Sequence, residues 1–496
     1  MQVQLSRSKY ITPFTFLMAI CTLLFLGCQT ERVDNSFTIS YASKYEANAW
    51  SKLDSLMARI KVPEFPDSIY NVLDYGAKGD SVSNDLPALS EAISACAFNK
   101  GGTVYVPAGQ YFLKGPIHFK SNVNLYLEEG ARIFFSQNYK HYLPVVKVRW
   151  EGTVCYNYSP LIYGYQLENI AITGKGIIDG AAKEWSIEWR KLQKPDKKVL
   201  RQMGNDTIPE IERVFGNGFM DGDGDGKDDG FGDGQMHYLR PTLIEFYECK
   251  NILMSDFTIR DSPFWTVHPV FSKHITIRNL DVSGAVLNDD GIDPDSCEDV
   301  LIEGCTIKTH DDAISIKAGR DQDAWNRPPS RNIIVRNNTL LSGVNALCIG
   351  SEMSGGVQYM FAENNTIGHG KHALNFKCNL DRGGQVQNIF IRNTTIESCE
   401  EAMFIFRMDY HGYRGNNYPT KFNDFYVSNI ICRQVDESIF KIIGVGSQPI
   451  TRIFLSDIQV HKAGKVGDFK QTKDIVMNQV TVAGKEVLFE NKYSNK

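Results

Sequence analysis

Acidic residues that could carry out acid–base chemistry gather at two places in the chain. Asp290 ends one run of acids, and Asp311 and Asp312 form a second run. Neighbouring carboxylates repel one another, so the pKa of one is raised while another stays ionised. Such a set provides an acid and a base at the same pH, as glycoside hydrolysis requires. From the acids alone, a calcium site or solvated turns explain the pattern equally well.

A repeated phrase predicts how these acids are held. Short apolar phrases recur from residue 169, and from residue 251 onward their starts are 23, 25, 33, 27, 29, 36 and 28 residues apart. Short strands at an imperfect period, with no helical periodicity between them, predict an all-β fold. We expect a right-handed parallel β-helix, in which each coil buries its apolar side against the next. The phrases begin at Asn169, Asn251, His274, Asp299, Asn332, Tyr359, Asn388, Asp424 and Arg452.

The spacing of the acids fits one coil of this solenoid. Asp290 and Asp312 are 22 residues apart, and stacked coils lie about 4.8 Å apart. We therefore expect both carboxylates on neighbouring coils of one face. Asn at the phrase starts suits the bends, because Asn tolerates left-handed conformations and its amide can bond along the stack. A short N-terminal amphipathic helix, ending at about Phe98, is expected to cap the open end of the solenoid.

A series of ordered motifs extends over most of the chain, from about Asn71 to about Val445. They lie at residues 72–80, 174–180, 262–269, 290–297, 311–317 and 349–356. In this order they resemble the polygalacturonases, family 28 of the glycoside hydrolases, whose fold is a pectin-lyase-like solenoid. The resemblance implies an inverting enzyme that cuts α-linked galacturonides in pectin-type or other anionic polysaccharides.

The same resemblance implies roles for the three acids. Asp311 is expected to protonate the leaving oxygen, while Asp290 and Asp312 hold and deprotonate the attacking water. Inversion needs room for this water, roughly 6.5–9.5 Å between carboxyl groups. No cofactor is expected for catalysis. The residues expected to bind the substrate around these acids are Asn288, His310, Glu352, Asn375, Lys377, Arg382 and Tyr410.

Two positions depart from the family pattern. Val344 stands where the family usually has His, and Asn375 replaces the Arg of an Arg-x-Lys motif that keeps Lys377. His310 replaces a usual Gly and either substitutes in part for the missing His or is a turn residue. Losing a guanidinium fork weakens two-point recognition of a carboxylate. A side-branch or modified uronide, or another acidic glycan, therefore stays open as the substrate.

An insertion at about 186–239 contains a second acidic pattern. Its acids and a glycine follow the spacing of a calcium loop, with a backbone carbonyl as the seventh ligand, but the usual Glu at the twelfth position is missing. A structural Ca²⁺ is expected, with a flexible acidic loop as the alternative. The expected metal residues are Asp221, Asp223, Asp225, Lys227 and Asp229.

The N-terminal residues resemble an export signal. Two basic residues precede an apolar stretch over 14–26, and Cys28 follows Leu-Gly as in a bacterial lipobox. We expect a signal peptide at 1–27, a linker lipidated at Cys28 over 28–66, and a catalytic β-helix over 67–492. The protein is then an exported outer-membrane lipoprotein, periplasmic or on the cell surface. The expected contact with the membrane is this anchor alone, and the expected state is a monomer.

Composition excludes several classes of function. The 496 residues are 42% hydrophobic with a net charge of −5, which argues against disorder and leaves no basic excess for nucleic acid. Eleven Cys without a CxxC spacing argue against a zinc site and favour buried thiols. Two other functions stay open: a polysaccharide lyase, although the acids supply no Arg or Lys base, and a noncatalytic glycan-binding β-helix.

Overall fold

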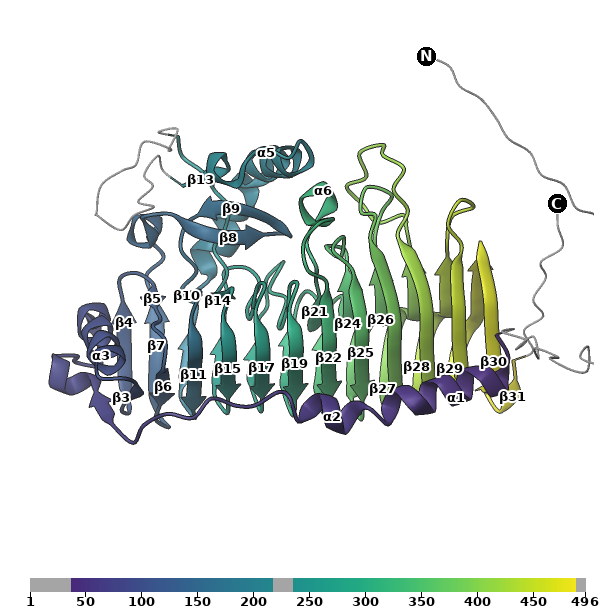
Figure 1. The fold of residues 1–496 in the computed structure, drawn as a ribbon, viewed down its shortest axis with the longest axis horizontal. Coiled ribbons are helices and arrows are strands. Elements are labelled where there is room, and N and C mark those ends of the chain that lie inside the picture. Colours follow the sequence, from purple (N-terminus) through teal and green to yellow (C-terminus); the bar gives the residue numbers. More distant parts are fainter. Residues whose placement is uncertain (1–36, 217–234, 488–496) are drawn as a thin grey trace, which may run out of the picture. The chain divides into compact units, whose positions relative to one another are not determined.

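The computed structural model describes residues 37–216 and 235–487, and these form a parallel β-helix (Figure 1). One sheet of 25 strands winds along the described chain, and nearly all its pairings are parallel. The right-handed parallel β-helix predicted from the repeats is therefore confirmed. A three-stranded sheet lies outside the stacked coils, and the helices of the described chain are short.

The repeated phrases pair with one another in register along the first face of the solenoid. Ile170 pairs with Ile252, which pairs with Ile275. These positions are fully buried, so each coil adds an apolar layer to a continuous core. The strands of this face are β1 Ile69–Asn71, β3 Gly102–Val106, β6 Val123–Leu127, β11 Glu168–Gly174, β15 Lys250–Ser255, β17 Lys273–Arg278, β19 Glu298–Glu303, β22 Ser330–Arg336, β25 Val357–Glu363, β27 Gln385–Arg407, β28 Lys421–Ile443, β29 Ile450–Lys470 and β30 Thr472–Val482, and β31 Lys485–Glu486 pairs antiparallel with the last.

The Asn residues that begin these phrases form the predicted ladder. Asn169 and Asn251 have φ of 55° and 58°, in the left-handed region. The amide of Asn251 donates to the Oδ1 of Asn169 at 2.9 Å, and Asn169 donates to Asn122 at 2.9 Å. These side chains therefore stabilise the bends along the stack and are structural, as their position predicted.

The second and third faces complete each coil. The second face consists of β2 Asp80–Asn84, β4 Gly109–Leu113, β7 Ala131–Phe135, β12 Ile177–Asp179, β16 Thr258–Arg260, β18 Asp281–Ser283, β20 Thr306–Thr309, β23 Thr339–Ser342 and β26 Thr366–Lys377. The third face consists of β5 Ile117–His118, β10 Ile162–Tyr165, β14 Ile244–Tyr247, β21 Ile314–Ile316, β24 Asn345–Gly350 and the end of β26. Isolated bridges at Val267 and Ile292 continue the third face between β14 and β21.

A helix covers one end of the solenoid, as predicted. Helix α3 (Leu86–Phe98) buries Leu89, Ile93 and Cys96 in the main core. Asp85 precedes this helix and accepts hydrogen bonds from the backbone N–H groups of Lys78 and Gly79, at 2.6 and 3.1 Å. The apolar end of the first coil is thereby closed off from water.

The stretch expected to be a linker is partly helical. Helices α1 (Ile39–Trp50) and α2 (Leu53–Met57) run along the outer side of the first face (Figure 1). Trp50 packs edge-on against Phe361, with ring centroids 5.3 Å apart, and Tyr45 stacks on Tyr426 at 5.2 Å. Stacked aromatic rings that point outward from the coils need an apolar cover, and these helices supply it.

Most of the described insertion packs on a small separate sheet. This sheet contains β8 Val146–Trp150, β9 Thr153–Asn157 and β13 Val214–Phe215. Helix α5 (Lys194–Asn205) rests on it through buried Leu200. The remaining short elements are η1 Val72–Tyr75, η2 Tyr139–Tyr142, η3 Trp185–Trp189, α4 Arg190–Leu192, η4 Glu210–Glu212 and α6 Asp321–Ala324.

Several sequence predictions fall outside the described residues. The expected calcium loop at Asp221–Asp229 and the lipidation site Cys28 both lie there. Among the described helices, none has the length and apolar character needed to cross a membrane. The nine cysteines of the described chain are all buried and unbridged, which confirms the expectation of buried thiols.

Candidate active site

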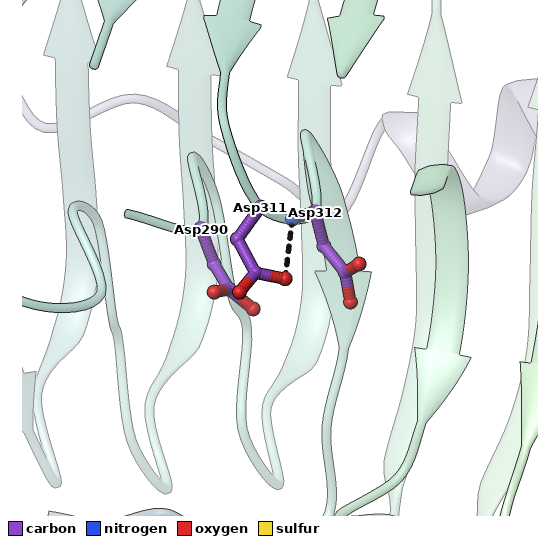
Figure 2. A group of neighbouring side chains, drawn as sticks. All are labelled: Asp290, Asp311 and Asp312. Carbon is purple, nitrogen blue, oxygen red and sulfur yellow. Dashed lines mark hydrogen bonds between the residues drawn. The ribbon is translucent and has the colours of Figure 1, made fainter. Parts of the chain in front are cut away.

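Three carboxylates converge where the second face turns into the third (Figure 2). One oxygen from each of Asp290, Asp311 and Asp312 lies within 4.8 Å of the others. Asp290 and Asp312 precede Ile292 and Ile314, which bridge neighbouring coils, and the N–H of Gly291 donates to the carbonyl of Asp312 at 2.9 Å. The prediction that Asp290 and Asp312 share one face on adjacent coils is therefore confirmed.

Two buried lysines set the charge of this cluster. The Nζ of Lys377 lies 2.8 Å from Asp312, and the Nζ of Lys317 lies 3.3 Å from Asp290. Both ammonium groups are almost fully buried, so their charges act in a low dielectric. A cation bound among the acids would meet these two positive charges, which argues against the calcium interpretation of the cluster.

The three acids differ in the pKa that their surroundings impose. Burial alone would raise the pKa of Asp312, but Lys377 and Lys317, with hydrogen bonds from Lys377 and Asn345, hold it below its usual value. Burial and the charge of Asp312 raise the pKa of Asp311. Burial, then Asp293 and Asp311, raise the pKa of Asp290 well above its usual value. The cluster thus holds an ionised carboxylate beside protonatable ones, the split that acid–base catalysis needs.

A fourth acid lies under the cluster and was not predicted to matter. Asp293 is fully buried, its carboxylate oxygens accept no hydrogen bond, and the Nζ of Lys317 is 3.9 Å away. Burial raises the pKa of Asp293 to about 7, against the opposing charge of Lys317. Lys317 is shared between Asp290 and Asp293, so Asp293 affects how strongly this lysine interacts with Asp290.

Asp289 fixes the backbone of the expected general acid. Its carboxylate, fully buried, accepts from the N–H of Asp311 at 2.8 Å and from the N–H of His310 at 3.0 Å. The carboxylate of Asp311 in turn accepts from the N–H of Asn288 at 3.1 Å. The sequence does not reveal this role, because Asp289 and Asp290 are adjacent aspartates and nothing in their types tells which one binds the backbone of Asp311.

Asn345 connects Asp312 to the next coil. Its Nδ2 donates to the Oδ1 of Asp312, and its Oδ1 accepts from Asn375 at 2.7 Å and lies 2.8 Å from the Nδ1 of His372. The Nε2 of His372 lies 3.2 Å from Glu401. Asn345 and Asn375 therefore belong to one buried network that holds Asp312.

The cluster lies at the bottom of a cleft of about 910 Å³. Of the residues expected to bind substrate, Asn288, Glu352, Lys377 and Tyr410 line this cleft. Asn288 is held by Arg240, whose Nη2 donates to its Oδ1 at 2.7 Å. Tyr410 stands over Lys377, with 5.2 Å between the Nζ and the ring centroid.

The other three expected residues do not line the described cleft. His310 is exposed, which agrees with the turn alternative. Asn375 is buried behind Asp312, and Arg382 is buried between Asp321, at 2.7 Å, and the carbonyl of Ser351, at 2.7 Å. The side chains of Asn375 and Arg382 thus contact neighbouring protein groups around the site.

Glu352 keeps a group of cations in place at the side of the cleft. Its Oε1 accepts from Arg320 at 2.7 Å, and its other oxygen lies 3.7 Å from the Nζ of Lys317. Burial would raise the pKa of Glu352, but Arg320, Lys317 and Arg382 hold it far below its usual value. Glu352 is thus a permanent anion whose role is to position cations.

The insertion supplies a wall of the cleft that the sequence analysis missed. Basic residues of α4 and α5 face the cleft at steps of three and four along the chain. This spacing places them on one side of a helix, and it was the available signal in the sequence. The six basic residues are Arg190, Lys191, Lys194, Lys197, Lys198 and Arg201.

The spacing of the acids bears on the stereochemistry of the reaction. The expected separation of roughly 6.5–9.5 Å refers to the two carboxyl groups of an inverting enzyme. The 4.8 Å in this structure is an upper limit on the distance between single oxygens of Asp290, Asp311 and Asp312, not between whole carboxyl groups. The cluster is tight enough for one small molecule to contact all three carboxylates.

Comparison with protein families identifies the chain. A family model described as glycosyl hydrolases family 28 matches residues 194–483, more than half of the 496 residues. The chain belongs to glycosyl hydrolase family 28. A second model, described as rhamnogalacturonase A/epimerase, pectate lyase-like, matches residues 69–129, the entry segment of this family-28 protein.

Individual relatives agree with membership in family 28. The chain is 28% identical to a probable polygalacturonase of Vitis vinifera over 80% of its own length and 74% of that protein. It is 28% identical to an exo-poly-alpha-D-galacturonosidase of Dickeya chrysanthemi, over 73% of its length and 62% of that protein. The structure of an exopolygalacturonase from Thermotoga maritima superposes with a TM-score of 0.78 at 34% identity, covering 87% of this chain and 96% of the other. The protein is therefore a glycoside hydrolase of family 28.

Proposed function

We propose that the protein hydrolyses α-linked galacturonides in pectin-type chains, by direct displacement with inversion. The observation that carries the proposal is an ionised Asp312 next to acids of raised pKa, at the bottom of a cleft lined by cations. The named activities of the relatives support galacturonide as the sugar. Lys317 and Lys377 line the cleft, and in this proposal their charges offset the carboxylate of the sugar at the scissile bond.

The proposed reaction uses the three acids in separate roles. Asp311 keeps its proton because of its raised pKa and gives it to the leaving glycosidic oxygen. Asp312, held ionised, takes the proton of the attacking water as the water bonds to the anomeric carbon, and Asp290, which its raised pKa keeps protonated, helps to hold that water. Raising the pH deprotonates Asp311, whereas lowering it protonates Asp312, so activity falls on both sides of an optimum.

The decisive test is to measure reducing ends released from polygalacturonate and its oligomers, with the product anomer followed by NMR. We expect release without a gain of ultraviolet absorbance, and an inverted anomer in the first product. A new absorbance from an unsaturated sugar would instead show a lyase. A retained anomer would contradict direct displacement. Binding without turnover on any acidic glycan would favour a noncatalytic function.

We also propose that the enzyme acts from a chain end. The loop between β27 and β28 approaches the insertion where Arg414 Nη1 donates to the carbonyl of Arg201 at 3.3 Å, and both residues line the cleft. We infer that this contact forms a wall that closes one side of the cleft to a polymer chain. Two of the relatives are named for exo action. Early hydrolysis of a galacturonate hexamer should give one short product from the chain end and the remaining oligomer. A broad mixture of early products would contradict action from a chain end.

We further propose export with lipidation at Cys28, on the basis of the basic, apolar and Leu-Gly-Cys order of the N-terminal residues. A Cys28→Ser variant expressed in a Gram-negative host should lose incorporation of labelled fatty acid and leave the membrane fraction. Retained labelling in the variant would show that Cys28 is not the modified residue.

A further inference from the structure

One face of helix α5 presents a row of positive charges to the cleft. Lys194, Lys197, Lys198 and Arg201 follow one another at steps of three, one and three residues, and all line the cleft. Arg190 of α4 continues the row. A helix places residues three, four and seven apart on one side, so the charges act together along the cleft.

The row divides into paired and unpaired charges. Lys197 and Arg201 are bound to buried Glu151, at 2.6 and 2.5 Å. Burial would raise the pKa of Glu151, but Lys197, Arg201 and Arg320 lower it to about 2, so this acid neutralises its partners permanently. The side chains of Arg190, Lys194 and Lys198 are exposed and have no ion pair or hydrogen bond within residues 37–216 and 235–487.

The helix that carries this row is held firmly. Leu200 is fully buried, and a Cβ added to Gly204 would lie 2.8 Å from the side chain of Thr153, so α5 touches β9 closely. Asp196, on another side of the helix, lies 3.0 Å from the Nδ1 of His237 and accepts from the N–H of Tyr238 at 2.7 Å. Unpaired charges on a fixed helix form a preorganised surface, which lowers the entropy cost of binding.

We propose that Arg190, Lys194 and Lys198 form a binding site for the carboxylate of a second uronate, one that is not at the scissile bond. The proposal rests on the proposed function, because it assumes that the polymer enters this cleft. It makes the substrate class an acidic oligosaccharide with charge on successive sugars. A neutral side branch at that position would leave the row unused.

The position of the row along the cleft supports a sugar away from the catalytic acids. From Arg201, at the wall made with Arg414, to Lys194 the helix rises about 10 Å, at 1.5 Å per residue. Arg201 lies at the wall, and the unpaired Lys198 and Lys194 lie successively farther from it along the helix. A substrate held at the wall by its end would bring its later carboxylates past Lys198 and Lys194.

The test compares a double variant, Lys194→Gln with Lys198→Gln, with the parent on galacturonate oligomers. The ratio of kcat/KM for the tetramer over that for the dimer should fall about tenfold, since two partly exposed carboxylate contacts are lost. The matched control is Lys120→Gln with Lys175→Gln, which removes the same charge from exposed positions outside the cleft. The control should keep the parental ratio. An unchanged ratio in the Lys194/Lys198 variant would overturn the proposal.

Binding separates this inference from the proposed function. With Asp311→Asn added to prevent turnover, calorimetry of tetragalacturonate should show weaker binding, by about tenfold, in the Lys194→Gln and Lys198→Gln background. If the parent releases no reducing ends from any galacturonide but this difference in binding remains, the hydrolase proposal fails and the carboxylate site stands. If the parent binds no tetragalacturonate, or both proteins bind it equally, the carboxylate site is wrong.

Discussion

The floor of the cleft, formed by Asp290, Asp311, Asp312, Lys317 and Lys377, differs from the wall on α5 in how its charges are paired. On the floor every cation is matched: Lys377 is bound to Asp312, and Lys317 is shared between Asp290 and Glu352. On the wall, Lys194 and Lys198 are exposed and unpaired within the described chain. An unpaired buried charge is strongly destabilising, whereas an exposed charge is solvated by water and can stay unpaired until a ligand binds.

This difference separates catalysis from recognition. The floor is built by the repeat, in which adjacent coils fix carboxylates at a spacing that side-chain motion cannot easily change. The wall is built by an insertion outside the repeat, which can vary without disturbing the coils. Floor variants should therefore change kcat and the pH profile for every substrate, while wall variants should change KM according to substrate length.

The largest effect is expected from Asp311→Asn on the floor. The amide keeps the shape of the side chain but cannot give a proton to the leaving oxygen, so kcat should fall by about 10²–10⁴ for dimer and polymer alike. Reducing-end assays over a range of substrate concentrations measure this, with circular dichroism as the control for folding. A loss confined to KM, or a loss only on long substrates, would remove Asp311 from the catalytic floor.

The next effect concerns Asp289, which touches no sugar in the proposed mechanism. Asp289→Ala frees the N–H groups of His310 and Asp311 that its carboxylate now binds. We expect kcat to fall by about tenfold to a hundredfold, because the general acid loses its fixed position. Asp289→Asn keeps one acceptor and should lose less. Equal activity in the Ala variant and the parent would show that the backbone of Asp311 is held without this carboxylate.

The repeat made the floor predictable and left the network around it hidden. Asp290 and Asp312 could be placed on adjacent coils because 22 residues is about one coil. The role of Asn345 could not be found in this way, because it depends on which side chain of the next coil it meets. The buried contacts of Arg382 with Asp321 and Ser351 could not be predicted either, since a buried arginine and a substrate-binding one look alike in sequence.

The wall was hidden by a different cause. The charges at Lys194 and Lys198 follow a helical spacing, but the only site predicted in the insertion was the calcium loop at Asp221 to Asp229. The low net charge of −5 also gave no hint of a local basic surface. Net charge averages over the molecule, whereas a cleft responds to the few charges that line it.

A smaller effect on the floor would show how Asp312 is kept ionised. Asn345→Ala removes a hydrogen bond that lowers the pKa of Asp312, so that pKa rises and the acidic side of the activity profile should move to higher pH. We expect kcat at the optimum to fall by about tenfold. His372→Gln is the comparison, because it leaves the bond between Asn345 and Asp312 intact and should keep the acidic limb in place. Identical shifts in both variants would mean that the histidine, not the amide, sets this pKa.

The smallest effect concerns salt at the wall. Ions screen exposed charges over about 8 Å at 0.15 M, but they screen buried pairs much less. Raising NaCl should therefore increase the KM of the parent for the tetramer several-fold, and for the Lys194→Gln, Lys198→Gln variant about half as much. The kcat of both proteins should respond little, because Lys377 and Asp312 are buried together. If salt lowered kcat and left KM unchanged, the assignment of substrate binding to the exposed wall and of catalysis to the paired floor would be wrong.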